Sequence, residues 1–393
     1  MILGAGTLAQ ATFSAVSVGL PALAPALREH YRLSLGETGV VLGAVGIGML
    51  FTLLPWGLLA DRLDERLVIV VGLAGAGAAL VGAGWTDSYP SLVGVLIAAG
   101  ALGASVNAAS GRAIMGWFSS DQLGLALGIR QTAVPIGGAA AAAGLPWLAS
   151  SGGTHLAFVV LGCGCVGGAL VAGALMRGSP KRTAPELGDV TQPLRDRKMW
   201  LLGGGAALFV TAQIATTGFL VLFLHEHRGV STHAAAGVLA GINVLSIGAR
   251  IGAGRWSDRM RARLRPVGLI GLTLAAATVA VAALVDAPLA LLIPALVVAG
   301  VLSMSWNGLA FAAAAEAAGP TRTGAALGFQ QTLLGVVIAG VPPAFAVIAA
   351  GSWRLAFALS AIGPLLGVLA LRAVPESKMG TVIAFEGAAP PPV

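Results

Sequence analysis

Long apolar runs dominate this chain, and short polar segments separate them. Twelve of these runs are long enough for helices that cross a bilayer, each of which needs about 20 apolar residues. The runs cover residues 3–27, 36–60, 67–86, 91–117, 123–149, 155–176, 199–224, 233–257, 266–285, 288–317, 324–350 and 353–372. The pattern therefore predicts an all-α membrane protein with twelve transmembrane helices.

The longest polar interruption lies midway along the chain, at residues 177–198. It predicts two six-helix units, at 1–176 and 199–372, joined by a cytoplasmic central loop. The remaining tail, 373–393, ends in GAAPPPV, and we expect it to be disordered because it offers little apolar surface to bury.

The two predicted units carry similar motifs. The segment LREHYRLS at 27–34 returns as LHEHRGVS at 224–231, and GLALGIRQT at 124–132 returns as GAALGFQQT at 324–332. Asn107 and Asn307 share the 200-residue offset of the second pair. We interpret the units as two pseudo-symmetric six-helix bundles. Parallel repeats with a binding site between them are a known transporter architecture.

Composition and charge support a membrane location. Of 393 residues, 57% are hydrophobic and 10% are charged, whereas soluble proteins carry about 25% charged residues. If both termini are cytoplasmic, the inner loops and tail hold 15 of the 23 Lys and Arg residues and the outer loops hold four. This distribution follows the positive-inside rule. We therefore read the net charge of +7 as topology in the cytoplasmic (inner) membrane and not as a nucleic-acid surface.

Two loop motifs resemble a known family. The chain reads GLLADRLDER after the second predicted helix, at 57–66, and GRWSDRMRAR after the eighth, at 254–263. Both resemble the G-x-L-a-D-r-x-G-r-r signature of the major facilitator superfamily, although Asp64 and Arg261 replace its second glycine. The resemblance covers nearly the whole chain. It implies the fold of that superfamily and a cytoplasmic conformational latch that holds the outward-open state, with the candidate residues Gly57, Asp61, Arg62, Asp258 and Arg259.

Other signatures bear on the branch of the family. Leu96 replaces the arginine usual in helix 4, and AVPIGG at 133–138 only partly matches the helix 5 motif of drug antiporters. The segment GARIGAGRWSDR at 248–259 resembles the arginine-bearing helix 8 of oxalate/formate, monocarboxylate and nitrate/nitrite porters. There the arginine that matches Arg250 binds the anion. Leu53 replaces the second arginine of nitrate porters, which favours an organic acid over nitrate.

Three arginines lie inside predicted spans, where a charge is costly and therefore marks a functional candidate. Arg250 lies about 12 Å from the inner end of its helix, near the midplane. The alternative is that Arg250 is tied structurally to a helix carbonyl. Arg130 either lines the cavity or forms a cytoplasmic gate. Arg112 lies near an inner helix end, where its side chain can reach the interface, so it is a candidate gate or coupling residue.

Glu316 is the only embedded acid that we expect. It either pairs with cytoplasmic arginines or carries a coupled proton. An excess of buried guanidinium groups over carboxylates predicts a cavity that accepts an anion, and the planar guanidinium matches a carboxylate with two hydrogen bonds. Amides in the same spans either line this cavity or make interhelical hydrogen bonds; they are Gln131, Gln331, Gln330, Asn107, Asn307, Asn243 and Gln213.

The sequence thus predicts a monomeric secondary transporter that moves a small organic anion, with a carboxylate favoured, by alternating access. The alternative is a proton-coupled multidrug or small-molecule exporter of the same superfamily. A third possibility is a non-transporting membrane sensor. No Walker, HExxH or CxxC motif occurs, so we expect no enzymatic activity, cofactor or metal site. Import, export, uniport, symport and exchange all remain open at this stage.

Overall fold

The computed structural model describes residues 2–117, 128–176, 195–319 and 323–375. Within these ranges every regular element is a helix. The helices of the first part are α1 (Ile2–Ser17), α2 (Leu20–Tyr31), α3 (Leu35–Arg62), α4 (Glu65–Ala83), α5 (Tyr89–Trp117) and α7 (Ala133–Leu175). The helices of the second part are α9 (Arg197–Gln213), η1 (Ile214–Gly218), α10 (Leu220–Leu222), η2 (Phe223–His227), α11 (Thr232–Met260), α12 (Leu264–Ala283), α13 (Leu289–Ser305), α14 (Asn307–Ala318), α15 (Thr323–Gly351), α16 (Trp353–Ser360) and α17 (Ile362–Arg372).

The predicted all-α membrane fold is confirmed. Eleven stretches of the described residues are long and apolar enough to cross a membrane. One of them, Gly128–Leu175, spans 48 residues and covers two predicted helices. Non-helical backbone at Gly152 and at Gly153, where φ is +68°, breaks it in the middle. A glycine adopts this left-handed conformation without the strain that a side chain brings. The stretch therefore supplies two crossings, which accounts for all twelve predicted helices.

Local polar residues fix where several helices begin. Ser34 and Glu37 form a reciprocal capping box at the start of α3, with the Ser34 oxygen accepting from the Glu37 amide. Asp64 caps α4, and Ser231 caps α11 by accepting from the Ala234 amide. Each cap satisfies an amide at a helix start that has no intrahelical acceptor.

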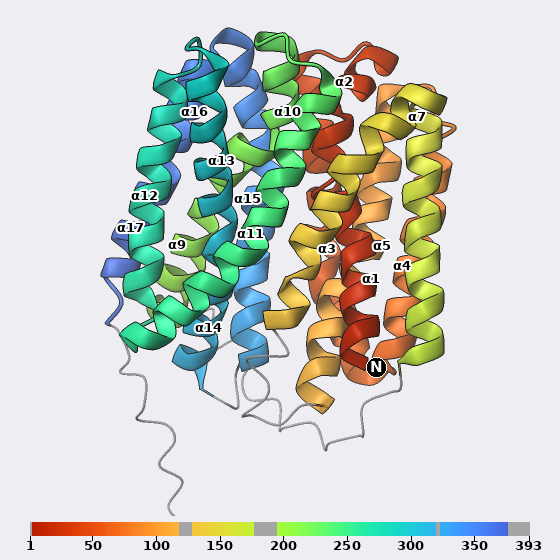
Figure 1. Ribbon diagram of the computed structural model, residues 1–393. Coiled ribbons are helices and arrows are strands. Elements are labelled where there is room, and N and C mark those ends of the chain that lie inside the picture. The colour runs from red at the N-terminus through yellow and green to blue at the C-terminus, as the bar shows by residue number, and fades with distance from the viewer. Residues whose placement is uncertain (1, 118–127, 177–194, 320–322, 376–393) are drawn as a thin grey trace, which may run out of the picture.

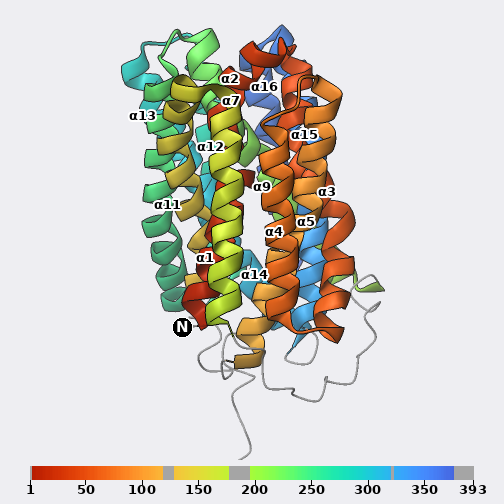
Figure 2. The same cartoon turned by 90° about the vertical axis from the view of Figure 1, so that its right-hand side faces the viewer.

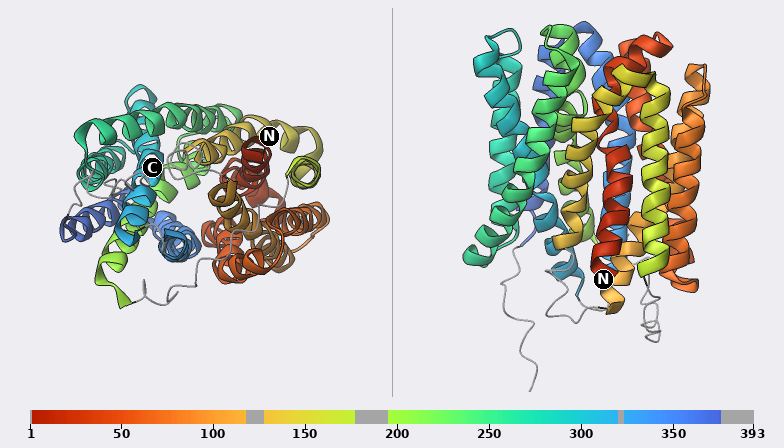
Figure 3. Two further views of the ribbon diagram at one scale, coloured as in Figure 1. Left: turned by 90° about the horizontal axis from the view of Figure 1, so that it is seen from below. Right: turned by 45° about the vertical axis from the view of Figure 1, so that its right-hand side comes forward.

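The helices gather into two groups that lie side by side (Figure 1). We call the described residues up to 176 the N-half and those from 195 the C-half. Seen along the helix axes, the two groups occupy opposite sides of the molecule (Figure 3, left). The N-terminus lies at the lower end of the bundle in Figures 1 and 2, which we call the N end, and the opposite end is the far end. The exact boundaries 1–176 and 199–372 stay a prediction. Most of the central loop and of the tail lies outside the described residues.

The two halves pack closely along α3 and α15 toward the far end. A Cβ atom added at Gly39 would lie 2.6 Å from the Ala346 Cβ, and one at Gly335 would lie 3.3 Å from the Leu50 side chain. Leu54 follows on the same face of α3 toward the N end, and it is 63% exposed. Within the described residues, the α3–α15 packing therefore extends from the far end to about the middle of the bundle.

Candidate substrate site between the two halves

A second contact between the halves joins α11 to α7. On α11, Asn243 and Arg250 are seven residues apart, so they lie on one face of the helix. Gly138 and Gln131 of the N-half are also seven residues apart and face them. A Cβ atom at Gly138 would lie 2.5 Å from Asn243 Oδ1, which shows how closely the chains approach. Arg250 therefore faces the other half and not the lipid.

The Arg250 guanidinium is half-buried and holds a backbone carbonyl from each half. Its Nε donates to the Met304 carbonyl at 2.7 Å, and its Nη1 donates to the Gln131 carbonyl at 2.8 Å. Met304 lies in the last turn of α13, where carbonyls lack intrahelical partners, before the interruption at Trp306. Among the described residues, Nη2 has no hydrogen-bond partner and the guanidinium has no carboxylate partner.

Arg130 lies inside the N-half, with only 8% of its surface exposed. Its Nε donates to Ser110 Oγ at 2.8 Å, and its Nη2 donates to Gln10 Oε1 at 3.2 Å and to the Asn107 carbonyl at 3.1 Å. Gln10 in turn donates to Asn107 Oδ1 at 2.9 Å. Neighbouring residues thus have different environments: Gln131 is joined to Arg250 at the interface, and Arg130 is held by neutral oxygens within its own half.

The counterparts of these residues in the C-half lack hydrogen-bond partners among the described residues. Gln330, the counterpart of Arg130, is 1% exposed, and neither of its amide atoms has a partner among the described residues. Asn307 Oδ1 and the indole nitrogen of Trp306 are also buried without partners there. Gln330 packs beside Gly203 of α9, and the Trp306 ring lies 5.4 Å from the Phe209 ring on the same helix. The unpartnered atoms of Gln330, Asn307 and Trp306 therefore gather where α9, α14 and α15 meet.

The other predicted amides are more dispersed. Asn243 Nδ2 donates to the Leu239 carbonyl at 2.9 Å, and its Oδ1, at the interface, has no partner among the described residues. Gln213 Oε1, at the end of α9, is likewise unpartnered within that part of the chain. The side chains of Gln131 and Gln331 are half-buried.

The predicted latch residues lie at the N end. Asp258 accepts from Arg263 Nη1 at 2.7 Å, and Glu316 accepts from Arg263 Nε at 2.9 Å, so both carboxylates share one arginine of their own half. Burial acts to lower the pKa of Arg263, and the hydrogen bonds to Glu316 and Asp258 raise it above its ordinary value. Arg62 and Arg259 are exposed, and Gly57 has no atom within 4 Å of its Cβ position. The side chains of Asp61 and Arg112 lie outside the described residues.

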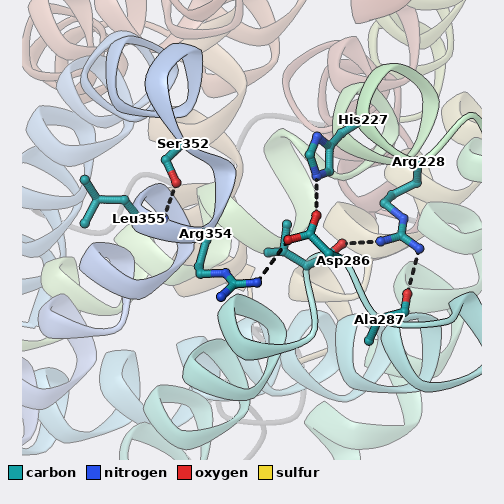
Figure 4. A network of polar contacts seen from close by, with 8 residues as sticks. His227, Arg228, Asp286, Ala287, Ser352, Arg354 and Leu355 are labelled. Atoms are coloured by element: carbon teal, nitrogen blue, oxygen red, sulfur yellow. Dashed lines mark hydrogen bonds and ion pairs between the residues drawn. The ribbon is translucent and has the colours of Figure 1, made fainter.

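Ion pairs gather at the far end. Arg28 of α2 pairs with Glu226 of η2 across the two halves, beside an open surface pocket of about 410 Å³. Within the C-half, Asp286 accepts from Arg354 at 3.0 Å and lies 3.0 Å from His227 Nε2 (Figure 4). The hydrogen bond with His227, together with that from Arg354, lowers the pKa of Asp286.

Sequence reasoning missed several of these groups. Gln10 and Ser110 complete the environment of Arg130, and the carbonyls of Met304 and Gln131 hold Arg250. Gln10 was open to detection as an isolated amide in an apolar run, and Ser110 lies one helical turn from Asn107. The carbonyls had no signal of their own, because every residue has one.

Comparison with known proteins decides the family. The model of the Major Facilitator Superfamily matches residues 5–342. The chain belongs to the major facilitator superfamily. It is 34% identical over 357 residues to uncharacterized MFS-type transporters of Mycobacterium tuberculosis strains CDC 1551 and H37Rv, which covers 89% of this chain and 79% of each relative.

Solved structures of the superfamily share the fold. The xylose transporter of E. coli, in a partially occluded inward-open conformation, superposes with a TM-score of 0.78 at 16% identity, covering 96% of this chain and 98% of that one. A bacterial homolog of the human lysosomal transporter Spinster, inward-facing and occupied, gives a TM-score of 0.76 at 17% identity, with 95% and 96% coverage. At these identities the likeness establishes the MFS fold of the chain and leaves its substrate to other evidence.

Proposed function

We propose that this MFS protein is a secondary transporter of a small organic anion, with a carboxylate as the favoured substrate. The observation that carries the proposal is Arg250, a guanidinium held between the two halves by neutral carbonyls alone among the described residues. A positive charge at this depth is costly unless a negative partner compensates it. A carboxylate has the charge and the planar geometry that a guanidinium binds best.

The buried polar atoms of the C-half support a second feature of the substrate. Trp306 and Asn307 lie two and three residues after Met304, whose carbonyl accepts a hydrogen bond from Arg250. An unpaired buried polar atom costs about 1–3 kcal/mol. A substrate that also carries hydroxyl or amide groups would supply partners to these atoms. We therefore favour a polar carboxylate over a purely apolar one.

Orientation and mechanism belong to the same proposal. The positive-inside distribution supports an orientation with the N end and both termini in the cytoplasm and the protein in the cytoplasmic membrane. The described halves are packed together at the far end, so this conformation corresponds to one that opens inward. Transport would then proceed by rocking of the halves about the site, with Arg250 as the anion anchor.

The acidic residues do not favour the multidrug alternative. A proton-coupled exporter needs a protonatable acid near the centre of an apolar cavity. Glu316 lies instead at the N end, 37% exposed and paired with Arg263. Asp258, the other carboxylate on that arginine, is 64% exposed. The proposal therefore leaves the source of coupling open among uniport, proton symport and anion exchange.

Substrate-dependent thermal stability tests the proposal directly. Purified protein would be heated with a panel of organic acids, sugars and cationic drugs, because a ligand that binds only the native state raises the unfolding midpoint. We expect carboxylates to stabilise the parent and to lose that effect in Arg250→Ala. Arg255→Ala is the matched control, since Arg255 lies exposed on the same helix. Stabilisation by sugars or drugs alone, or unchanged carboxylate flux in Arg250→Ala liposomes, would reject the assignment.

A further inference from the structure

The Gln131 carbonyl is available to Arg250 because of a proline four residues later. In an α-helix the amide of residue 135 would donate to this carbonyl, but Pro135 has no N–H. The neighbouring hydrogen bonds show that the interruption is local: the Thr132 amide donates to the Ile129 carbonyl at 3.1 Å, and the Ile136 amide donates to the Thr132 carbonyl at 3.1 Å. The helix therefore continues past an exposed acceptor.

The other half of the molecule lacks this arrangement. At the 200-residue offset, Gln331 matches Gln131 and Gly335 matches Pro135. Glycine keeps its amide, and α15 runs without interruption from Thr323 to Gly351. At the 197-residue offset, Leu53 takes the place of Arg250. Of the two equivalent positions, only the α7–α11 contact therefore combines the free carbonyl with an arginine that uses it.

We infer that Pro135 is a positioning residue, which leaves the Gln131 carbonyl free to hold Arg250 across the two halves until an anionic substrate takes its place. The part of this inference that concerns substrate rests on the proposed function. Without substrate, the neutral Gln131 carbonyl accepts the hydrogen bond that the anion would otherwise accept from Arg250. It keeps the guanidinium aimed into the interface and joins the halves at the depth of the site.

Binding of an anion would reverse both effects. A hydrogen bond from a guanidinium to a carboxylate is roughly twice as strong as one between neutral groups, so a carboxylate can displace a backbone carbonyl. Once Arg250 leaves Gln131, one tie between α11 and α7 is lost. Substrate binding and release of the N-half are then coupled through a single group.

A double-mutant cycle without substrate tests the tie. Pro135→Ala restores an amide that competes for the Gln131 carbonyl, and Arg250→Ala removes the group that uses it. Pro135→Ala should raise the unfolding midpoint more in the Arg250→Ala background than in the parent, by about 2 °C or more, because only the parent loses the Arg250 contact in exchange. Pro146→Ala is the control: it lies buried in the same helix, and it should show no coupling to Arg250. Equal effects in both backgrounds would overturn the inference.

The competition with substrate needs a second readout. If the carbonyl competes with the anion, Pro135→Ala should lower the KM for a transported carboxylate about fivefold, and Pro146→Ala should leave it unchanged. A coupled cycle with an unchanged KM would retain the tie and reject the competition. If no carboxylate binds the parent protein, the proposed function fails and the competition fails with it, while the cycle still decides whether Pro135 positions Arg250.

Discussion

At the scale of single residues, two arginines in apolar helices differ in their hydrogen-bond partners. Arg130 is nearly fully buried and bonds to side chains and a carbonyl within its own half, whereas Arg250 bonds to carbonyls of both halves. The first arrangement stabilises one half as a unit. The second depends on how the two halves sit together, so it can change during transport.

The contrast between Arg130 and its counterpart Gln330 gives a paired prediction. Arg130→Met removes the donor shared by Gln10, Ser110 and Asn107, and buried acceptors left without partners cost about 1–3 kcal/mol. Gln330→Met removes two buried atoms that already lack partners among the described residues, so it should be neutral or stabilising. Thermal unfolding of both variants in one detergent checks this. A loss of stability in Gln330→Met equal to that in Arg130→Met would contradict it.

At the scale of helices, the interruptions and close approaches position the site. The break at Trp306 ends α13 beside Arg250, and glycines let α3 approach α15 until backbone and side chains nearly touch. Such contacts depend on the relative placement of whole helices. A substitution that adds side-chain volume at one of them should therefore shift the equilibrium toward conformations in which that contact is open.

Gly39→Val should drive the far end apart. Its first added carbon would lie 2.6 Å from the Ala346 Cβ and 2.7 Å from the Pro342 carbonyl, distances that require the helices to shift. Spin labels would be attached at Arg32 and His233, both exposed at the far end, in a background that lacks Cys163 and Cys165. Gly39→Val should lengthen the distance between these two labels. Gly144→Val is the control, since no atom lies within 4 Å of that Cβ position. An unchanged distance would argue against close packing of α3 on α15.

Asp286 gives a prediction about pH. Its contacts with His227 and Arg354 lower its pKa in the folded state, so the stability it contributes is present above its unfolded pKa and is lost as the pH falls through the lower folded value. The gap in unfolding midpoint between the parent and Asp286→Asn should therefore persist from neutral pH down to about pH 4 and close only below it. A gap that closes between pH 7 and 5 would assign the effect to a different group.

At the scale of the whole molecule, the described halves meet along three lines: α3 with α15, α11 with α7, and α2 with α10, η2 and α11. All three lie from the middle of the bundle to the far end. Rocking of the halves about this region would open one end while the other closes, which is the geometry that alternating access requires.

The Arg28–Glu226 pair should contribute modestly to this closure. Both side chains are 30% exposed, and pairs this open to solvent are worth at most about 1 kcal/mol. Arg28→Glu creates a repulsion and should lengthen the distance between the labels at Arg32 and His233. The double variant Arg28→Glu/Glu226→Arg should restore it. A double variant that stays as open as the single one would show that the pair does not hold the far end closed.

Much of the fold was predictable because its causes are local. Apolar runs of sufficient length fix the helices in lipid, and the polar breaks fix their ends. The structure nevertheless links two predicted helices within α7 more tightly than the hydropathy pattern indicated, because the chain turns back with only Gly152 and Gly153 out of helical conformation (Figure 1). It also divided the predicted helix 288–317 at Trp306. Such details depend on packing and not on hydropathy.

The candidate site was predictable only in part. A charge inside an apolar run is visible in the sequence, so Arg130 and Arg250 stood out. Their partners did not, because Gln10 is 120 residues from Arg130 and the Met304 carbonyl is 54 residues from Arg250. Hydropathy alone does not separate the roles of two arginines that both lie at membrane depth, and only the resemblance at 248–259 distinguished Arg250.

By itself, the sequence determined that this chain is a twelve-helix membrane protein with two related halves. Hydropathy and internal repetition depend only on the order of residues along the chain. Only the tertiary structure decided which arginine lies between the halves, because that depends on the rotation of each helix about its axis. A turn of one residue moves a side chain by about 100°. For this reason Arg130 and Gln131 are neighbours in the chain, and yet one lies inside its own half and the other joins the two.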